Sequence, residues 1–175
     1  VVTIFLGVAE VSVYTIYYMI CNAVKKIVNS ISSGLTAAFG NMIAKNEGEV
    51  LNKNFRLYEL VSSIITVILF TSAGLLILPF VSVYTKSITD VNYVRPTFAY
   101  ILTVAEAIYC IRLPYHAVTL AAGHFKQTKN GAFVEVIINI VISVILVKSF
   151  GIVGVAIGTL CAMVFRTIQY AVYLS

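Results

Sequence analysis

The sequence has few charged residues. Only 11% of its 175 residues are charged, against about 25% in an ordinary soluble domain. Hydrophobic residues make up 60% of the chain. This composition excludes a disordered chain and a nucleic-acid-binding tail, and it argues against almost any soluble enzyme. It predicts a membrane protein, in which the net charge of +5 bears on orientation rather than on nucleic-acid binding.

Residue types that support catalysis or metal binding are also scarce. The chain has one aspartate, Asp90, and two histidines, His116 and His124, which do not form an H-E-x-x-H pattern. Its three cysteines lie in apolar segments without a C-x-x-C pair, which argues against zinc and against a disulfide framework. No G-x-S-x-G or P-loop pattern occurs. We therefore expect no catalytic residues, no metal, no cofactor and no enzymatic activity.

Long apolar runs predict an all-α fold, a single polytopic transmembrane helix bundle. The 11–44 segment would be about 51 Å long as a helix, which exceeds a hydrocarbon core of about 30 Å. It must therefore tilt, break near Gly34 or project from the membrane. Because both ends of the chain are apolar, we expect it to be a piece of a longer polytopic protein. The predicted elements are a helix stub at residues 1–6 and spans at residues 11–44, 55–84, 96–122, 132–148 and 152–174.

The polar loops between the spans predict an orientation. Loops 45–56 and 123–131 fall on one side of the membrane and carry five lysines and arginines. Loops 7–10, 86–95 and 148–151 fall on the other side and carry three. Because cytoplasmic loops are enriched in lysine and arginine, the first pair of loops is predicted to be cytoplasmic.

Two adjacent lysines, Lys25 and Lys26, lie near the middle of the predicted span 11–44. Charges at membrane depth are costly, and each is a functional hypothesis. Neighbouring helical positions differ by about 100°, so at least one lysine should face a cavity or another helix. A water-filled cavity that attracts anions is one interpretation. In the other, the helix leaves the membrane near Ile31 and both lysines extend to the interface.

The predicted span 96–122 carries Glu106, Arg112 and His116. Glu106 and Arg112 are six residues apart and on different faces, so a direct pair is not expected. Arg112 precedes a kink predicted at Pro114, where freed backbone groups can line a cavity. Arg112 is thus a candidate cavity residue, or else a structural partner of Glu106 or of another helix. His116 shares a face with Arg112 and is interpreted as a buried polar residue, with a proton relay as the alternative.

The last two spans contain further polar residues. Arg166 lies mid-span and is either a second cavity cation or the partner of an acidic group. Glu135 and Asn139 are four residues apart on one helix face, which favours interhelical hydrogen bonds. Gly154 and Gly158 have the small-x-x-x-small spacing that predicts close approach of two membrane helices.

Tyrosine is the prominent aromatic residue: the chain has 11 tyrosines and no tryptophan. Tyr14, Tyr17 and Tyr18 share a helix face near a predicted helix end. Anchoring at the membrane interface is the favoured interpretation. A platform that contacts sugars is the alternative.

The order of several short motifs resembles the polysaccharide transporter branch of the MOP flippase superfamily, the oligosaccharide and O-antigen flippases. The resemblance covers essentially the whole chain, and a G-x-x-K-x-T loop followed by a G-I-x-G hairpin is its strongest part. It departs from many relatives by having S-G-L-T at residues 33–36 in place of a proline. The motifs are L-G at 6–7, V-Y at 13–14, F-G-N at 39–41, P-F at 79–80 with Tyr84, R-L-P at 112–114, A-G-H-F-K-Q-T at 122–128, Asn139 and G-I-V-G-V-A-I-G-T at 151–159.

The resemblance implies that this chain is the C-terminal six-helix half of a MOP- or MATE-like transporter, with a truncated first helix. The two halves would enclose a cavity that takes a polyprenyl-diphosphate-linked oligosaccharide across the cytoplasmic membrane by alternating access. The bilayer, the lipid-linked oligosaccharide and the other half would be its partners, with no nucleic acid. A membrane glycosyltransferase, a non-transporting scaffold and, first among the alternatives, a MATE-type cation-coupled drug antiporter remain open. The predicted cavity cations are Lys25, Lys26, Arg112 and Arg166, and the predicted coupling or polar network is Glu106, His116, Glu135 and Asn139.

Overall fold

The computed structural model describes residues 1–88 and 90–174 and arranges them in seven helices. No strand occurs among these residues, which confirms the all-α prediction. The part of loop 86–95 at residue 89 lies outside the described residues. The helices are α1 (Val2–Leu6), α2 (Val8–Ala44), α3 (Gly48–Tyr84), α4 (Pro96–Ile111), α5 (Leu113–Ala121), α6 (Phe125–Phe150) and α7 (Ile152–Leu174).

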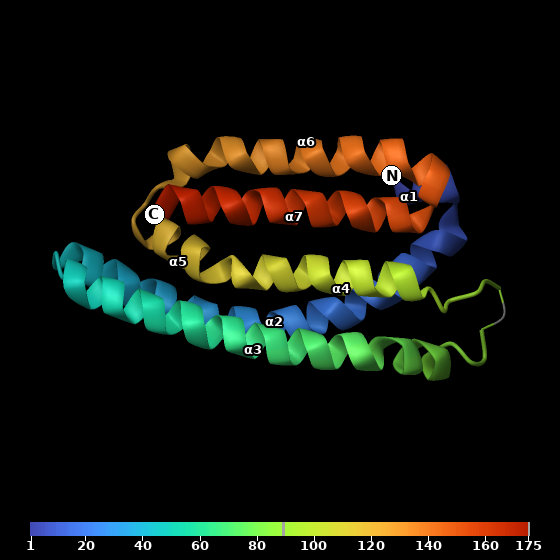
Figure 1. Ribbon diagram of the computed structural model, residues 1–175, viewed down its shortest axis with the longest axis horizontal. Coiled ribbons are helices and arrows are strands. Elements are labelled where there is room, and N and C mark those ends of the chain that lie inside the picture. Colours follow the sequence, from blue (N-terminus) through green and yellow to red (C-terminus); the bar gives the residue numbers. More distant parts are fainter. Residues whose placement is uncertain (89, 175) are drawn as a thin grey trace.

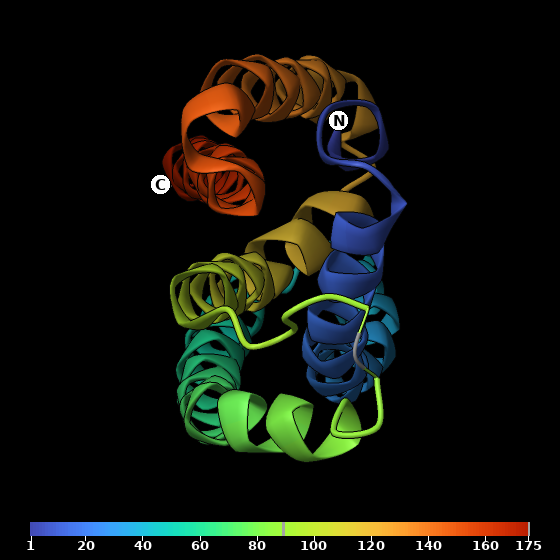
Figure 2. The ribbon, with the colours of Figure 1, turned by 90° about the vertical axis from the view of Figure 1, so that its right-hand side faces the viewer.

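The long helices lie roughly side by side (Figure 1). Viewed from one end, α6 and α7 form a pair on one side and α2 and α3 form a pair on the other, with α4 and α5 between them (Figure 2). The α2–α3 and α5–α6 connections lie at one end of the bundle (Figure 1). The α3–α4 and α6–α7 connections lie at the opposite end, so the loops alternate between the two ends as the sequence predicts.

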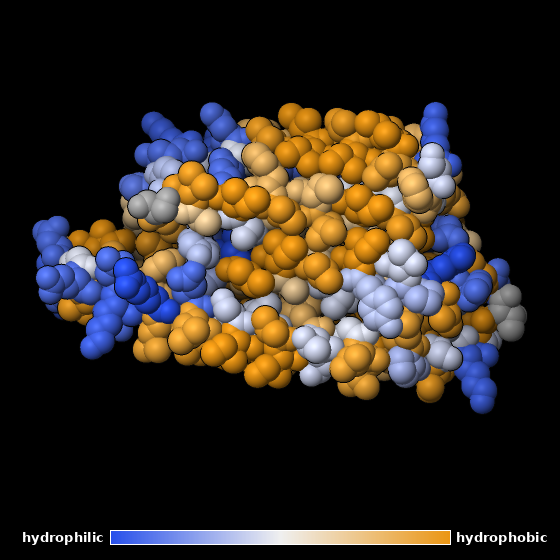
Figure 3. Space-filling view, viewed as in Figure 1, coloured by the Kyte–Doolittle hydropathy of each residue, from blue (hydrophilic) through white to orange (hydrophobic). Residues whose placement is uncertain are grey.

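Among the described residues, four helical segments are long and apolar enough to cross a membrane: Gly48–Tyr84, Pro96–Ala121, Phe125–Phe150 and Ile152–Leu174. Hydrophobic side chains cover the middle of the face in Figure 3, and hydrophilic ones gather at both ends. This distribution suits a multi-pass membrane protein. The segment predicted at 11–44 is a continuous helix, α2, but it is not among the four. Helix α2 carries three charged residues, Glu10, Lys25 and Lys26. Its membrane crossing stays a prediction.

Several helices extend beyond their predicted ends. Helix α3 begins at Gly48 rather than 55, α6 begins at Phe125 rather than 132, and α2 begins at Val8 rather than 11. The predicted loops 45–56 and 123–131 are therefore largely helical. The predicted ends were placed where hydropathy falls, which indicates the edge of the membrane rather than the end of a helix. Lysine, glutamate and glutamine have high helix propensity, so a helix can continue past that edge. The chain turns at Gly123 and Gly151, whose φ angles of 71° and 56° suit glycine.

Helices α4 and α5 are separated by a break at Arg112. Pro114 lacks an N–H group, and its ring would clash with the carbonyl group of Cys110 in a continuous helix. The predicted kink is therefore confirmed, and it lies just before the proline. By contrast, α2 continues through Gly34 and α3 through Pro79, so the break considered at Gly34 does not occur.

Helices α6 and α7 approach each other closely at two glycines of α7. A Cβ atom at Gly154 would lie 2.6 Å from the backbone carbonyl group of Leu146. A Cβ atom at Gly158 would overlap the Ser143 hydroxyl group and lie 3.0 Å from the Asn139 carbonyl oxygen. The predicted role of Gly154 and Gly158 in helix packing is confirmed, and this packing brings the polar face of α6 against α7.

Candidate polar cavity and its charge network

A cavity of about 400 Å³ lies among α1, α2, α4, α6 and α7. It is lined by both charged and aromatic side chains. Polar groups from four helices therefore meet inside a bundle whose outer surface is mainly apolar. The polar and aromatic residues that line the cavity are Tyr14, Tyr18, Lys25, Glu106, Tyr109, Asn139, Ser143 and Thr159.

An ion pair between α2 and α4 forms one wall of the cavity. The Lys25 ammonium group donates a hydrogen bond of 2.7 Å to a carboxylate oxygen of Glu106. The side chains are only 13% and 3% exposed, so water screens the pair weakly. The ammonium group also lies 5.2 Å and 4.9 Å from the ring centroids of Tyr18 and Tyr109. Lys25 is thus held by one carboxylate and two aromatic rings.

Two of the three neighbouring tyrosines of α2 line the cavity. Tyr14 and Tyr18 stack with centroids 5.9 Å apart and an angle of 16° between their planes. Tyr17 points elsewhere: its hydroxyl group donates to the Tyr93 carbonyl oxygen at 2.9 Å and accepts from the Arg95 N–H group at 3.0 Å. An aromatic surface thus exists at Tyr14 and Tyr18, and its contact with sugars stays a prediction.

Side chains of α6 and α7 form the facing wall. The Asn139 amide group donates to the Thr159 hydroxyl oxygen at 3.3 Å. This bond joins the two helices and confirms the interhelical role predicted for Asn139. Ser143 lies beside Gly158 on the same interface. The wall therefore presents amide and hydroxyl groups, which donate and accept hydrogen bonds without adding charge.

A second ion-pair cluster joins the α4–α5 break to α6 and α7. Glu135 lies between two arginines: Arg112 donates to one of its oxygens at 3.1 Å, and the Arg166 Nε atom is 3.5 Å from the other. Arg112 therefore pairs with Glu135 and not with Glu106. Arg166 was predicted to be either a second cavity cation or the partner of an acidic group. The geometry supports the second alternative, with Glu135 as the partner. The predicted interhelical role of Glu135 is confirmed, through ion pairs in place of neutral hydrogen bonds.

The Tyr109 ring connects the two clusters. Its centroid lies 4.9 Å from the Lys25 ammonium nitrogen and 4.8 Å from the Arg112 guanidinium carbon. The two cations thus contact one aromatic ring, whose electron-rich face attracts positive charge. With Glu106, Glu135 and Arg166, the network holds three cations and two carboxylates, a net charge of +1.

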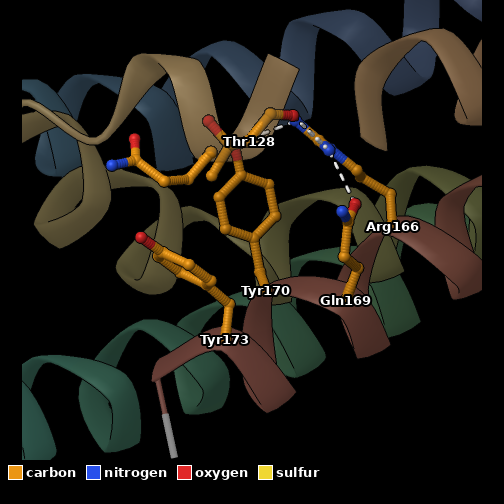
Figure 4. Close-up of a pocket in the computed structure, with 6 residues that line it drawn as sticks. Thr128, Arg166, Gln169, Tyr170 and Tyr173 are labelled. Carbon is orange, nitrogen blue, oxygen red and sulfur yellow. Dashed lines mark hydrogen bonds between the residues drawn. The ribbon is translucent and has the colours of Figure 1, made fainter. Parts of the chain in front are cut away.

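Arg166 also binds groups at the end of the bundle that holds the α5–α6 connection (Figure 4). Its guanidinium group donates to the Thr128 carbonyl oxygen at 2.9 Å and to the Gln169 amide oxygen at 2.7 Å (Figure 4). A Cβ atom at Gly131 would overlap both Arg166 and Gln169, so glycine leaves the room that this arrangement needs. His116 is half-buried with its ring edge-to-face against Tyr170, 5.7 Å between centroids, and its role stays a prediction.

The predicted cavity cations therefore occupy three kinds of environment. Lys25 lines the cavity, while Arg112 and Arg166 belong to the ion-pair cluster around Glu135. Lys26 is exposed and lies outside the lining of the cavity, because adjacent helical positions point about 100° apart. Tyr109 was not predicted, since its role depends on cations from two different helices.

Within residues 1–88 and 90–174, no group of three or more histidine, cysteine, aspartate or glutamate side chains could hold a metal ion. Comparison of the chain with protein-family models, with curated proteins and with solved structures finds no match.

Proposed function

We propose that this chain is one half of a membrane transporter that flips a polyprenyl-diphosphate-linked oligosaccharide across the cytoplasmic membrane by alternating access. The observation that carries the proposal is the polar, tyrosine-lined cavity around Lys25 and Glu106, inside a bundle of apolar helices. Buried ionisable groups are expensive in a membrane and are retained where they serve a polar cargo.

The groups around the cavity suit the proposed cargo. Faces of Tyr14 and Tyr18 offer apolar surface for the C–H face of a sugar ring, and Asn139 and Thr159 can exchange hydrogen bonds with its hydroxyl groups. The net charge of +1 over the linked network favours an anionic diphosphate over a cation. The polyprenyl tail would stay in the bilayer, which is the first partner of the protein.

The positions of the loops support the proposed orientation. The α2–α3 and α5–α6 connections, which fall in loops 45–56 and 123–131, lie at one end (Figure 1). With five lysines and arginines against three at the other end, this end would face the cytoplasm. The other half of the transporter would complete the cavity, as in transporters built from two similar repeats. The motif order that resembles oligosaccharide flippases adds separate support.

The alternative is a MATE-type antiporter that exports organic cations. Glu106 favours it, because a carboxylate that is only 3% exposed at a membrane cavity could bind a cation. Lys25 already neutralises this carboxylate, however, and the adjoining cluster adds a net positive charge. We therefore rank oligosaccharide transport first.

A complementation experiment tests the proposal. The protein is expressed in a strain that lacks its own oligosaccharide flippase but makes a matched cargo, and surface polymer and trapped polyprenyl-diphosphate oligosaccharide are measured. We expect the wild type and Lys26→Met to restore polymer, and Lys25→Met to leave the intermediate trapped. If the wild type leaves the intermediate trapped in every matched sugar pathway, drug-efflux assays with Glu106→Gln test the antiporter instead.

A further inference from the structure

A groove of about 290 Å³ lies between α2 and α3, apart from the polar cavity. Phe39 and Tyr58 form its floor, with ring centroids 5.9 Å apart. Its walls are apolar and remain accessible, since Leu57 is 60% exposed and Val61 43% exposed. The remaining apolar walls come from Ile31, Leu35, Ala38 and Met42.

One end of the groove is polar and basic. The Asn54 amide group reaches across it to the Met42 sulfur atom at 3.8 Å. Lys45 directly follows the last residue of α2 and lies three residues after Met42. Lys53 precedes Leu57 by four residues of α3, a spacing that places Lys53 on the groove side of that helix. Both lysines are exposed. The hairpin as a whole is net positive, since it carries Lys45, Lys53 and Arg56 against Glu47 and Glu49.

The groove leads from the apolar part of the bundle to this basic hairpin. Helix α3 has 37 residues, about 56 Å at 1.5 Å per residue, so it is longer than a hydrocarbon core of about 30 Å. The α2–α3 hairpin projects past α5 and the end of α7 (Figure 1). Hydrophilic side chains gather at its tip (Figure 3). In a bilayer that covers the apolar part of α3, the groove would therefore cross the level at which acyl chains give way to headgroups.

We propose that this groove binds one acyl chain of an anionic phospholipid, with the headgroup phosphate between Lys45 and Lys53. The apolar floor and walls match a hydrocarbon chain, and the two ammonium groups match a phosphate at its end. The site requires only that the bundle lies in a bilayer. It does not depend on the oligosaccharide cargo.

The chain has no tryptophan. The experiment uses the full protein with any tryptophan outside residues 1–175 replaced by phenylalanine, so a single introduced tryptophan reports from one place. The experiment uses Leu57→Trp in phosphatidylcholine vesicles that contain brominated phosphatidylglycerol or brominated phosphatidylcholine, whose bromine atoms quench tryptophan on contact. We expect phosphatidylglycerol to reach half-maximal quenching at a several-fold lower mole fraction. Neutralising either lysine should remove most of this preference, and high salt should weaken it.

Matched variants separate the groove from the general lipid surface. Leu76→Trp lies on the same helix outside the groove and is 65% exposed in the wild type, so it should show no preference between the lipids. Lys45→Gln with Lys53→Gln should remove the preference at residue 57, whereas Lys86→Gln at the other end of α3 should keep it. Val61→Trp repeats the measurement if Leu57→Trp disturbs folding.

Equal quenching by the two lipids at residues 57 and 61 would overturn the proposal. So would a preference at residue 57 that survives neutralisation of both lysines, or an equal preference at residue 76.

A further variant, Ala38→Leu, places a larger side chain in the groove and should reduce quenching at residue 57 by the anionic lipid. Circular dichroism of each variant shows whether the helices are retained.

Discussion

Lys25 and Glu106 are 81 positions apart in the sequence, yet the Lys25 ammonium nitrogen lies 2.7 Å from a carboxylate oxygen of Glu106. The pair joins α2 to α4 beside the polar cavity. Removal of one member of a buried pair leaves the other charge without compensation, which is more costly than loss of both. The pair is therefore a structural link between two helices as well as the proposed cargo contact.

The first prediction separates these two roles. Lys25→Met and Glu106→Leu should each lower the free energy of unfolding by about 3–5 kcal/mol. The Lys25→Met/Glu106→Leu double variant should recover most of this loss and should still fail in transport. Unfolding is followed by denaturant titration in detergent, with Lys26→Met as the exposed control. If the double variant is as unstable as the sum of the two single variants, the account of the pair is wrong.

The second prediction concerns the cluster around Glu135. Glu135→Gln leaves Arg112 and Arg166 without their carboxylate partner. We expect a loss of about 3–5 kcal/mol in unfolding free energy. Arg112→Leu in the same background should restore part of it, because one unpaired cation is removed. Glu49→Gln, in the exposed hairpin, is the control and should change stability by less than about 0.5 kcal/mol.

The third prediction tests the contact of Tyr109 with two cations. Tyr109→Phe keeps the aromatic face and should retain transport and stability. Tyr109→Leu removes that face and should cost about 0.5–2 kcal/mol of stability, with lower transport. Melting temperature and polymer production are measured for both variants. Equal defects in the phenylalanine and leucine variants would show that the hydroxyl group, rather than the ring, is what matters.

The fourth prediction concerns helix packing. Gly158→Ala should destabilise the protein by about 1–3 kcal/mol, because its Cβ atom would overlap Ser143 of α6. Gly34→Ala should instead stabilise it by up to about 1 kcal/mol, since no atom lies within 4 Å of that Cβ position and α2 is helical there. Denaturant titration of the two alanine variants gives both values, and a stabilising Gly158→Ala would contradict the packing found here.

The sequence predicted the helix class, the break before Pro114 and the close approach at Gly154 and Gly158, because each follows from local chemistry. It placed the start of α3 too late because the polar residues after Gly48 continue the helix beyond the apolar run. The periodicity of a helix predicted that at least one of Lys25 and Lys26 faces a cavity or another helix. It could not show which one, since that choice depends on the position of Glu106 in another helix.

The sequence alone could not predict which residues of the charge network pair with one another. Glu135 of α6 pairs with Arg112 at the α4–α5 break and with Arg166 of α7, and this arrangement depends on how these helices pack. The contribution of Tyr109 has the same origin. A single sequence specifies which residues are polar within a span, and the packing of the bundle decides which of them meet.

The measurement that tests the central claim most directly is transport by the purified protein. The full transporter is reconstituted in proteoliposomes with a fluorescent polyprenyl-diphosphate oligosaccharide, and the fraction of label accessible to an external quencher is followed over time. We predict that the wild type moves label between leaflets and that the Lys25→Met/Glu106→Leu double variant, folded by circular dichroism, does not. Movement of label at the wild-type rate by that variant would contradict the account.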